Sequence, residues 1–169
     1  MVIQQQKQYS ILLLGDSCID KYHFGHCNRL SPEAPVPLLK LCYSRSQPGM
    51  ALNVKKNLQS FGNKIEIITN KSSLITKERF MDLKTGHQLM RLDTGEEKLL
   101  SPFEFDTISV EKYDCVVVSD YDKGFLRYEF CERLAQQCLK AKIPLFVDSK
   151  KMDLSCYEGA IIKINNIEY

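Results

Sequence analysis

Two short runs of consecutive apolar residues, Ile11–Leu14 and Cys115–Val118, constrain the fold of this chain more than any other feature. A strand that is apolar at every position, and not only at alternate positions, is typical of a parallel sheet that is buried on both faces. Similar but shorter or weaker runs occupy residues 65–68, 145–147 and 160–162. Because helix-like stretches separate several of these runs, we expect an α/β fold built on a parallel sheet.

Two segments between the apolar runs have the spacing of amphipathic helices. The first pattern is formed by Met50, Val54, Leu58 and Phe61, and Gly62 follows it as a suitable helix end. The second pattern is formed by Cys131, Leu134, Ala135 and Cys138, and Pro144 precedes the next apolar run. The order strand, helix, strand implies right-handed parallel crossovers.

Two further segments do not follow this α/β pattern. Residues 35–41 contain two prolines, each of which disfavours helix in itself and in the residue before it, so this segment is expected to be extended. Residues 76–81 and 88–92 flank a turn that contains Gly86, which predicts a β-hairpin. Together they indicate a small β-layer inserted into the α/β body.

Length, composition and charge exclude several classes of protein. A chain of 169 residues with 44% hydrophobic and 26% charged residues is typical of one soluble globular domain. The net charge of +2 gives no reason to expect nucleic acid or a membrane surface as a partner. The first apolar run is too short for a signal peptide or a membrane span, so we expect a cytoplasmic protein. The 7 cysteines include no Cys-x-x-Cys pair, which favours reduced, mostly buried thiols.

Four of the expected strands are followed by a carboxylate or a carboxamide. The ends of parallel strands meet at one edge of the sheet, where ligands bind in open α/β folds. Carboxylate and amide groups in fixed positions suit neighbouring hydroxyl groups of a polyol. The alternative is that Asp and Asn simply favour the turns that follow strands. The four residues are Asp16, Asp120, Asp148 and Asn165.

Two motifs in the first quarter of the chain are more specific. Residues 15–22 read Gly-Asp-Ser-Cys-Ile-Asp-Lys-Tyr, and residues 28–37 read Asn-Arg-Leu-Ser-Pro-Glu-Ala-Pro-Val-Pro. Both resemble the sugar-binding front end of the PfkB-type carbohydrate kinases, and specifically of the heptose-7-phosphate kinases. The second motif is similar to that family's "Arg-Ile-Ser-Pro-Glu-Ala-Pro-Val-Pro" almost letter for letter.

The resemblance continues to the last residue. Residues 48–54 are similar to the family's Gly-Gly-Ala-Ala-Asn segment, 75–79 and 88–93 to its lid hairpin, and 119–124 to its Ser-Asp-Tyr-x-Lys-Gly. Residues 147–150 resemble Val-Asp-Pro-Lys, and 163–168 resemble the Asn-x-x-Glu element that binds ATP and organises its magnesium. The resemblance implies a reduced ribokinase-like parallel sheet with flanking helices and an inserted small β-lid. It implies a single domain over residues 1–169, with lid segments at about 34–46 and 75–93.

The resemblance also implies a set of site residues. It assigns sugar-phosphate binding to Asp16, Asp20, Arg29, Gly49, Asn53, Arg91, Asp120 and Lys123. It assigns ATP binding to Asp148, Lys163, Asn165 and Glu168, with Glu168 also at the magnesium ion. Guanidinium groups suit a substrate phosphate, which is the reason to include Arg29 and Arg91; surface charge is the other interpretation of both.

Three departures from the family pattern bear on activity. The 6 residues from Thr69 to Leu74 are too few for the helix and strand expected there. Met50 replaces a glycine whose backbone freedom lets it approach the substrate. No Gly-Ala-Gly-Asp occurs in the sequence, so no catalytic residue is assigned. In the family this motif supplies the catalytic base and the anion hole.

These departures leave two functions open. In the first, which the resemblance implies, the chain belongs to a sugar kinase that uses ATP and Mg²⁺ and is active only if a partner chain supplies the catalytic half. Alternatively, it is a non-catalytic module for sugar-phosphate binding or dimerisation. A homodimer formed through the lid is a further expectation from the resemblance. The resemblance places His23 and His26 in a loop, where a metal site at His23, His26 and Cys27 is a weaker alternative to a solvated or locally packed role for these three residues.

Overall fold

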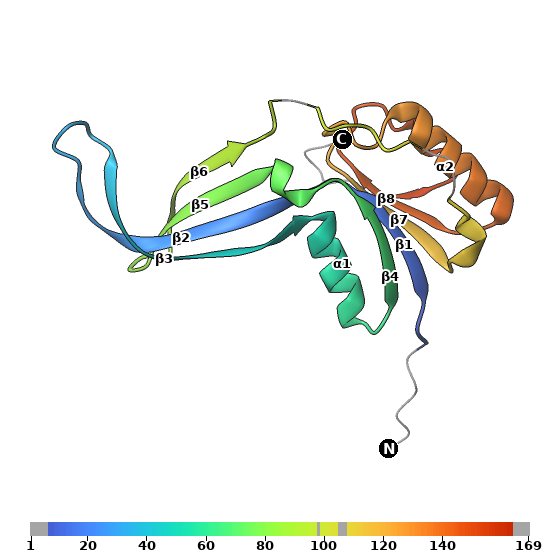
Figure 1. Ribbon diagram of the computed structural model, residues 1–169, viewed down its shortest axis with the longest axis horizontal. Helices are drawn as coiled ribbons and strands as arrows, with labels where there is room; N and C mark the ends of the chain where they lie inside the picture. Colours follow the sequence, from blue (N-terminus) through green and yellow to red (C-terminus); the bar gives the residue numbers. More distant parts are fainter. Residues whose placement is uncertain (1–6, 98, 105–107, 164–169) are drawn as a thin grey trace, which may run out of the picture. The chain divides into compact units, whose positions relative to one another are not determined.

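The computed structural model describes residues 7–97, 99–104 and 108–163, and these fall into two compact units. The first, which we call the sheet unit, comprises the segment that ends at Ser17, the segment Met50–Asn70, and the segment that begins at Leu99. The second, which we call the lid unit, comprises Cys18–Gly49 and the segment that begins at Lys71. Each unit is built around its own sheet (Figure 1).

The sheet unit contains a five-stranded sheet in the order β4-β1-β7-β8-β9, and every neighbouring pair is parallel. Its strands are β1 (Ser10–Gly15), β4 (Lys64–Thr69), β7 (Cys115–Asp120), β8 (Leu145–Ser149) and β9 (Ile161–Ile162). The five apolar runs in the sequence therefore predicted all five strands and their parallel arrangement. Only 6 residues, Asn70–Ile75, connect β4 to β5 of the lid unit, and they include a short 3-10 turn, Ser72–Leu74.

The register of the sheet brings the ends of its strands together. Gly15 at the end of β1 lies opposite Thr69 of β4 and Ser119 of β7. Ser119 and Asp120 lie in turn opposite Asp148 and Ser149 of β8. The residues that follow β1, β7 and β8 thus share one edge, as expected for parallel strands.

Two helices complete the sheet unit. Helix α1 (Ala51–Ser60) leads into β4, and helix α2 (Tyr128–Ala141) connects β7 to β8. Because β1 to β4 and β7 to β8 progress in opposite directions along the sheet, right-handed connections place the two helices on opposite faces. Both helices lie where the sequence predicted them, and α2 ends at Lys142 in the left-handed conformation, with φ 57°. Short 3-10 turns at Val110–Lys112 and Ser155–Tyr157 complete the unit.

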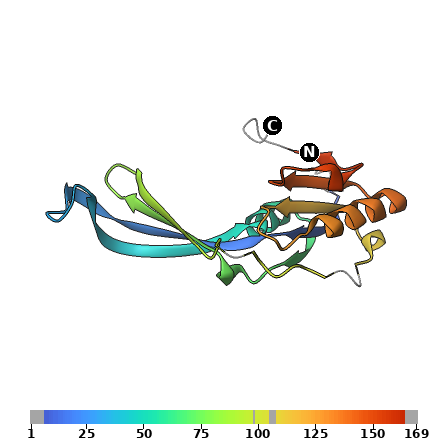
Figure 2. The same cartoon turned by 90° about the horizontal axis from the view of Figure 1, so that it is seen from above.

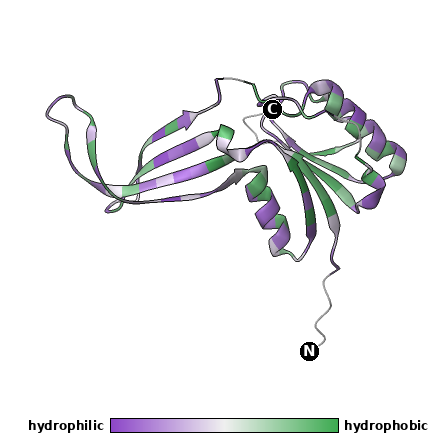
Figure 3. Cartoon of the chain, in the orientation of Figure 1, coloured by the Kyte–Doolittle hydropathy of each residue, from purple (hydrophilic) through white to green (hydrophobic). Residues whose placement is uncertain are grey.

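The apolar core of the sheet unit is centred on β1. Leu12, Leu13 and Leu14 are completely buried, as are Val116 of β7 and Leu134 of α2. The predominantly hydrophobic strands of this unit are visible in Figure 3. Burying apolar side chains at about 25 cal/mol per Å² is the main contribution to the stability of such a unit.

One face of β8 is left open. Burial alternates along the strand, so that Leu145 and Val147 are buried whereas Phe146 and Asp148 are exposed. Phe146 is 41% exposed and Ile161 on the neighbouring β9 is 59% exposed. Parallel sheets are usually covered on both faces, so this open apolar face is unusual.

The lid unit contains a four-stranded sheet in the order β3-β2-β5-β6. Its strands are β2 (Ser17–Leu30), β3 (Pro37–Met50), β5 (Thr76–Asp82) and β6 (Gln88–Thr94), of which β2 and β3 are the longest (Figures 1 and 2). Strands β5 and β6 pair antiparallel, which confirms the predicted hairpin, and β5 pairs parallel with β2. Of the extended segment predicted at residues 35–41, residues 37–41 begin β3, and the two residues before them precede the strand.

The expectation of a loop around His23 and His26 was wrong. Both residues lie within β2, whose residues 19–25 pair with β5 on one side and which lies beside β3 on the other. Strand β2 also belongs to the lid unit, outside the expected lid segments at 34–46 and 75–93.

All 7 cysteines are free thiols, and four of them, Cys18, Cys131, Cys138 and Cys156, are buried. Burial raises the pKa of the Cys131 thiol to about 12, which keeps it protonated. Among the described residues, no helix has the length and the apolar character needed to cross a lipid bilayer.

Candidate functional site

Asp16 is the most deeply placed of the predicted site residues. It follows β1 directly and is completely buried. Its backbone N–H donates to the Ser119 carbonyl oxygen at 3.2 Å, and its own carbonyl oxygen accepts from the N–H of Ala51, the first residue of α1, at 2.9 Å. The Asp16 carboxylate therefore sits where β1, β7 and the N-terminus of α1 meet.

The Asp16 carboxyl group is only half satisfied. Its Oδ2 accepts from the Tyr121 N–H at 2.7 Å, whereas its Oδ1 is buried without a hydrogen-bond partner among the described residues. Burial raises the pKa of this carboxyl to about 6 against the opposing effect of the Tyr121 N–H, and the negative charge of Asp120 raises it further. A buried acceptor of this kind can take a hydrogen bond from a ligand or carry a proton itself.

The turn that follows β1 is held in place on two sides. A Cβ at Gly15 would overlap with the Ser119 carbonyl oxygen, so only glycine allows β1 and β7 to approach this closely. The Ser17 N–H donates to Asn70 Oδ1 at 2.7 Å, and Asn70 Nδ2 donates back to the Ser17 carbonyl oxygen at 3.0 Å. These contacts fix the position of Asp16.

Asp120 serves an internal network. The residue is 1% exposed, and its Oδ2 accepts from Ser149 Oγ at 2.9 Å and from Tyr157 OH at 2.8 Å. The Lys151 ammonium lies 3.2 Å from the same oxygen. Asp120 Oδ1 accepts from the Asp122 N–H at 2.9 Å. Since both oxygens are engaged, Asp120 ties β7 to β8 and to the turn at Tyr157.

The residues at the start of α1 are placed differently. Asn53 is exposed in the first turn of the helix. The preceding Met50 is buried and has φ 57° and ψ −128°, a conformation that is normally reserved for glycine. The sequence comparison with the family pattern predicted that this position needs glycine, and the backbone at Met50 has that conformation. Lys123 is half-buried and lies in the segment between β7 and α2, where its carbonyl oxygen accepts from the Leu100 N–H at 2.7 Å.

Asp148 and Lys163 form a separate pair. Their side chains point to the open face of the sheet, and Lys163 Nζ donates to Asp148 Oδ2 at 3.3 Å. They border a hollow of about 190 Å³ whose walls include Val54, Val117, Phe146 and Ile161. Asp148 is paired with Ser119, the neighbour of Asp120, so the side chains of Asp148 and Asp120 point to opposite faces of the sheet. The strand-end carboxylates therefore do not form one cluster.

In the lid unit, Asp20 and Gly49 lie together. A Cβ at Gly49 would overlap with Asp20 Oδ2 and with Cys18 Sγ, so this close approach requires glycine. Arg79, which was not predicted as a site residue, donates from Nη1 to Asp20 Oδ1 at 2.6 Å. The side chains of Asp20 and Arg79 are 16% and 21% exposed.

Arg91 is engaged by its own strand. Its Nε and Nη2 both donate to the Asp93 carboxylate at 2.7 Å. This bidentate contact raises the pKa of the Arg91 guanidinium and lowers the pKa of the Asp93 carboxyl. Arg29, by contrast, is exposed near the far end of β2, about 30 Å along an extended strand from Asp20. The lid unit therefore does not bring Arg29 together with Asp20.

His23, considered above as a metal ligand, contacts two other side chains. Its Nδ1 lies 2.7 Å from Ser44 Oγ and its Nε2 lies 2.6 Å from Glu78 Oε2. The His23 hydrogen bond, together with Lys21, lowers the pKa of the Glu78 carboxyl. The described residues contain no group of three or more His, Cys, Asp or Glu side chains placed to hold a metal ion. The predicted nucleotide and magnesium residues Asn165 and Glu168 lie outside the described residues.

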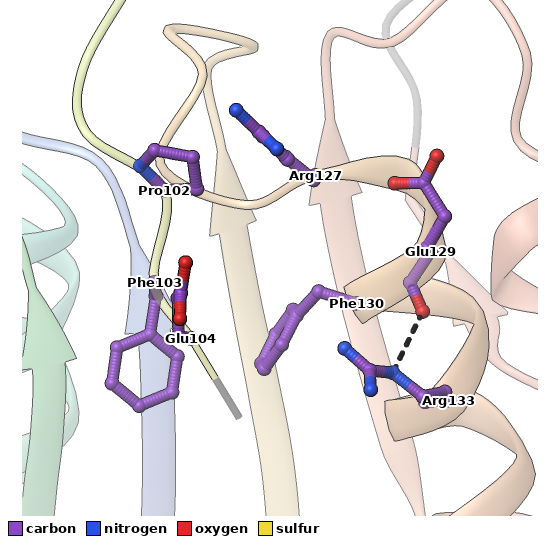
Figure 4. Close-up of a pocket in the computed structure, with 7 residues that line it drawn as sticks. All are labelled: Pro102, Phe103, Glu104, Arg127, Glu129, Phe130 and Arg133. Carbon is purple, nitrogen blue, oxygen red and sulfur yellow. Dashed lines mark hydrogen bonds between the residues drawn. The ribbon is translucent and has the colours of Figure 1, made fainter. Parts of the chain in front are cut away.

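Another hollow lies beside the N-terminal end of α2 and has a volume of about 260 Å³ (Figure 4). It is lined by Pro102, Phe103, Glu104, Arg127, Glu129, Phe130 and Arg133. None of these residues is a predicted site residue, and Arg133 Nε is turned to the Glu129 carbonyl oxygen at 3.3 Å. The strand ends, where the buried Asp16 and Asp120 lie, are therefore the better candidate site.

Comparisons with known proteins agree with the motifs. No protein-family model matches the chain. The bifunctional protein HldE of Koribacter versatilis is 33% identical over 187 residues, which cover 89% of this chain and 37% of the relative. HldE of Vibrio cholerae is 33% identical over 200 residues, which cover 98% of this chain and 40% of the relative. The chain is a homologue of the HldE proteins. It spans about 40% of the length of these curated relatives.

Solved structures show the fold of this HldE homologue. A carbohydrate kinase from Agrobacterium tumefaciens superimposes with a TM-score of 0.52 at 13% identity, covering 82% of this chain and 52% of that chain. Phosphofructokinase-2 from Escherichia coli gives a TM-score of 0.51 at 13% identity, covering 89% and 58%. The fold is that of the PfkB-type, ribokinase-like carbohydrate kinases, as the resemblance implied. The match to the Vibrio cholerae protein runs over 200 residues although this chain has 169, so the relative carries residues that this homologue lacks.

Proposed function

We propose that this chain is the sugar-binding part of a carbohydrate kinase whose acceptor is a heptose phosphate or a similar phosphorylated sugar. The observation that carries the proposal is the homology with HldE over nearly the whole chain, on the fold of carbohydrate kinases. The free thiols suit a reducing compartment, which supports the expected cytoplasmic location.

The proposed sugar-binding residues of the sheet unit act in two ways. The unpartnered Asp16 Oδ1, Asn53 at the start of α1 and Lys123 supply polar groups for the sugar phosphate. Asp120 acts indirectly, because its oxygens are engaged by Ser149 and Tyr157 and keep the ends of β7 and β8 in place. In the lid unit, Asp20, Gly49 and Arg91 are proposed to contribute, and Arg29 is proposed to contact a phosphate only if another chain brings that phosphate to it.

The nucleotide part of the site is proposed to involve Asp148 and Lys163. An ammonium group suits a phosphate of ATP, and the apolar walls beside it suit the base. The described residues thus fit part of a nucleotide site. When bound, Mg-ATP would supply the transferable phosphoryl group. Since no Gly-Ala-Gly-Asp occurs in the sequence, this chain offers no residue of that motif as the base for the acceptor hydroxyl.

The open face of β8 and β9 supports the idea that further polypeptide completes the sheet unit. Phe146 and Ile161 expose apolar surface that parallel sheets usually cover. We propose that a segment carrying the catalytic residues packs there, whether it belongs to the same polypeptide or to a second one.

A homodimer through the lid unit is the second part of the proposal on partners. Several large apolar side chains of this unit are exposed: Leu30, Val36, Leu41, Tyr43, Met90 and Leu92. A second copy of the chain would cover such a surface. Sedimentation analysis should show a dimer at micromolar concentration, and a monomer at high micromolar concentration would contradict the homodimer.

The proposal is tested by calorimetric titration of the purified chain with a heptose 7-phosphate and, separately, with ATP. We expect weak binding of the sugar phosphate, little or no binding of ATP, and no sugar-dependent consumption of ATP. Absence of any sugar-phosphate binding would contradict the sugar-binding role. Measurable sugar-dependent ATP consumption by the chain alone would contradict its incompleteness.

A further inference from the structure

The Asp20 carboxylate in the lid unit has two oxygens in different surroundings. Its Oδ1 accepts from Arg79 Nη1 at 2.6 Å. In the part of the chain that the structure describes, its Oδ2 has no hydrogen bond, and it lies where a Cβ on Gly49 would be. One oxygen is therefore fixed by a cation, and the other is available as an acceptor.

Arg79 itself is held in a defined orientation. Strands β2 and β5 pair in parallel so that Arg79 lies opposite Tyr22, two residues from Asp20. The Arg79 guanidinium carbon lies 5.2 Å from the centre of the Tyr22 ring, within the range of a cation–π contact. With a side chain that is 21% exposed, Arg79 is also partly shielded from water, which strengthens its interaction with Asp20.

The neighbouring arginine does not compete for this carboxylate. Arg91 lies directly opposite Arg79 on β6, but its Nε and Nη2 are engaged by Asp93. The absence of a side chain at Gly49 leaves room for the Asp20 carboxylate, since a Cβ there would overlap with Oδ2. The arrangement thus combines a fixed carboxylate, one available oxygen and a position without a side chain.

We infer that Arg79 is a positioning residue for sugar recognition, which orients the Asp20 carboxylate so that Oδ2 accepts a hydrogen bond from a substrate hydroxyl group. This inference rests on the proposed function, because the substrate class is the phosphorylated sugar proposed above. A carboxylate that is already oriented loses less conformational entropy on binding, so removing Arg79 weakens binding without removing a contact atom.

The experiment is a calorimetric titration of the full chain and its variants with a heptose 7-phosphate. We expect Arg79→Met and Asp20→Asn each to weaken binding tenfold or more, and Arg79→Lys to restore part of the loss by keeping the charge. The double variant should bind no more weakly than Asp20→Asn alone, because Arg79 acts through Asp20. The matched control is Arg45→Met. Arg45 also lies over the Tyr22 ring, at 5.6 Å, but it makes no ion pair with Asp20 in the described structure. The affinity of this variant for the sugar phosphate should therefore stay within twofold of the wild-type value.

Three outcomes would overturn the inference. If Arg79→Met binds the heptose 7-phosphate as tightly as the wild type, Arg79 does not position Asp20 for binding. Losses that multiply in the double variant would show that Arg79 acts independently of Asp20. A wild-type chain that binds no sugar phosphate would remove the proposed function and this inference with it, which distinguishes that failure from the other two. A cooperative urea transition for each variant verifies folding, and Arg79→Gln replaces Arg79→Met if the latter does not fold.

Discussion

The sheet unit and the lid unit of this chain are stabilised in different ways. In the sheet unit, apolar residues such as Leu12, Leu13 and Leu14 are completely buried between two layers. Among the described residues of the lid unit, the buried hydrophobic side chains are only Cys18 and Ile75. The lid unit is instead linked by ion pairs, such as Asp20–Arg79 and Lys77–Glu96, and by stacked rings.

This difference separates stability from recognition. Burial of aliphatic groups stabilises a fold strongly but leaves few polar groups to contact a polar ligand. Partly exposed ion pairs contribute little to stability but present charges in fixed positions. We therefore expect the sheet unit to depend on apolar burial and the lid unit to depend more on its ion pairs, and four substitutions or conditions test this contrast.

The largest effect is expected for Leu13→Ala at the centre of β1. Leu13 is completely buried, so the substitution removes apolar contacts and leaves a cavity that costs about 3 kcal/mol of unfolding free energy. The matched control is Leu41→Ala in the lid unit, where the side chain is 60% exposed and the loss should be below about 0.5 kcal/mol. Urea unfolding measures both, and equal losses would contradict the contrast between the units.

The next effect concerns the pH dependence of stability at Asp16. Its pKa rises from an ordinary 3.8 to about 6 on folding. The folded state therefore binds this proton more tightly, and the contribution of Asp16 to stability is largest below pH 3.8 and falls as the pH rises towards 6. The stability of Asp16→Asn relative to the wild type should increase by about 2–3 kcal/mol between pH 4 and pH 7.5. Urea unfolding across this pH range measures the difference in unfolding free energy, and Asp148→Asn, at an exposed position, is the control. A difference between Asp16→Asn and the wild type that does not change with pH would contradict the raised pKa of Asp16.

A smaller effect is expected for the strained backbone at Met50. Both Met50→Ala and Met50→Gly remove the side chain, but only glycine adopts φ 57° and ψ −128° without strain. We expect the glycine variant to be more stable than the alanine variant by about 1 kcal/mol. At Ala135, in the middle of α2, the order should be reversed, because glycine destabilises a regular helix by about 1 kcal/mol. Thermal unfolding of these variants is the measurement, and the same order at both positions would argue against strain at Met50.

The smallest effect is the response of the lid unit to salt. Lys77 Nζ and Glu96 Oε1 are 2.9 Å apart, with side chains 12% and 25% exposed, so salt should weaken the pair by less than about 1 kcal/mol. Raising NaCl to about 1 M should speed amide exchange in β5 and β6 by a few-fold and leave β1 unchanged. Mass-spectrometric hydrogen exchange can resolve this difference. Equal acceleration in both units would mean that ion pairs do not distinguish them.

The sequence predicted the sheet unit better than the lid unit for a physical reason. Strands buried on both faces, such as β1 and β7, consist of consecutive apolar residues, and this signal is visible in a single sequence. Strand β2 mixes charged, aromatic and polar residues along its 14 positions, so no regular pattern marks it as a strand, and the resemblance placed the segment around His23 in a loop. Its strand character depends on pairing with β5, which is distant in the sequence.

The candidate site was predictable only in part. The Gly-Asp motif predicted Asp16 and Asp20 as site residues, and their role stays a prediction, whereas the missing glycine indicated the unusual backbone conformation of Met50. Arg79 could not be assigned to Asp20, because their contact depends on the register between β2 and β5. The network of Asp120 with Tyr157 was also missed, since Tyr157 lies in a 3-10 turn without a periodic signal. Where side chains meet through non-local pairing, local sequence patterns carry little information.

The open face of β8 and β9 has a consequence for handling the protein. Phe146 of β8 and Ile161 of β9 lie at the end of the sheet, where β9 has no further strand beside it among the described residues. An exposed apolar face beside a free strand edge favours edge-to-edge self-association and poor colloidal stability at high concentration. Static light scattering of the isolated chain should therefore rise faster than linearly with concentration, and Phe146→Lys should suppress the rise. The surface that the proposed catalytic segment would cover is also the one that limits how concentrated a solution of the chain can be.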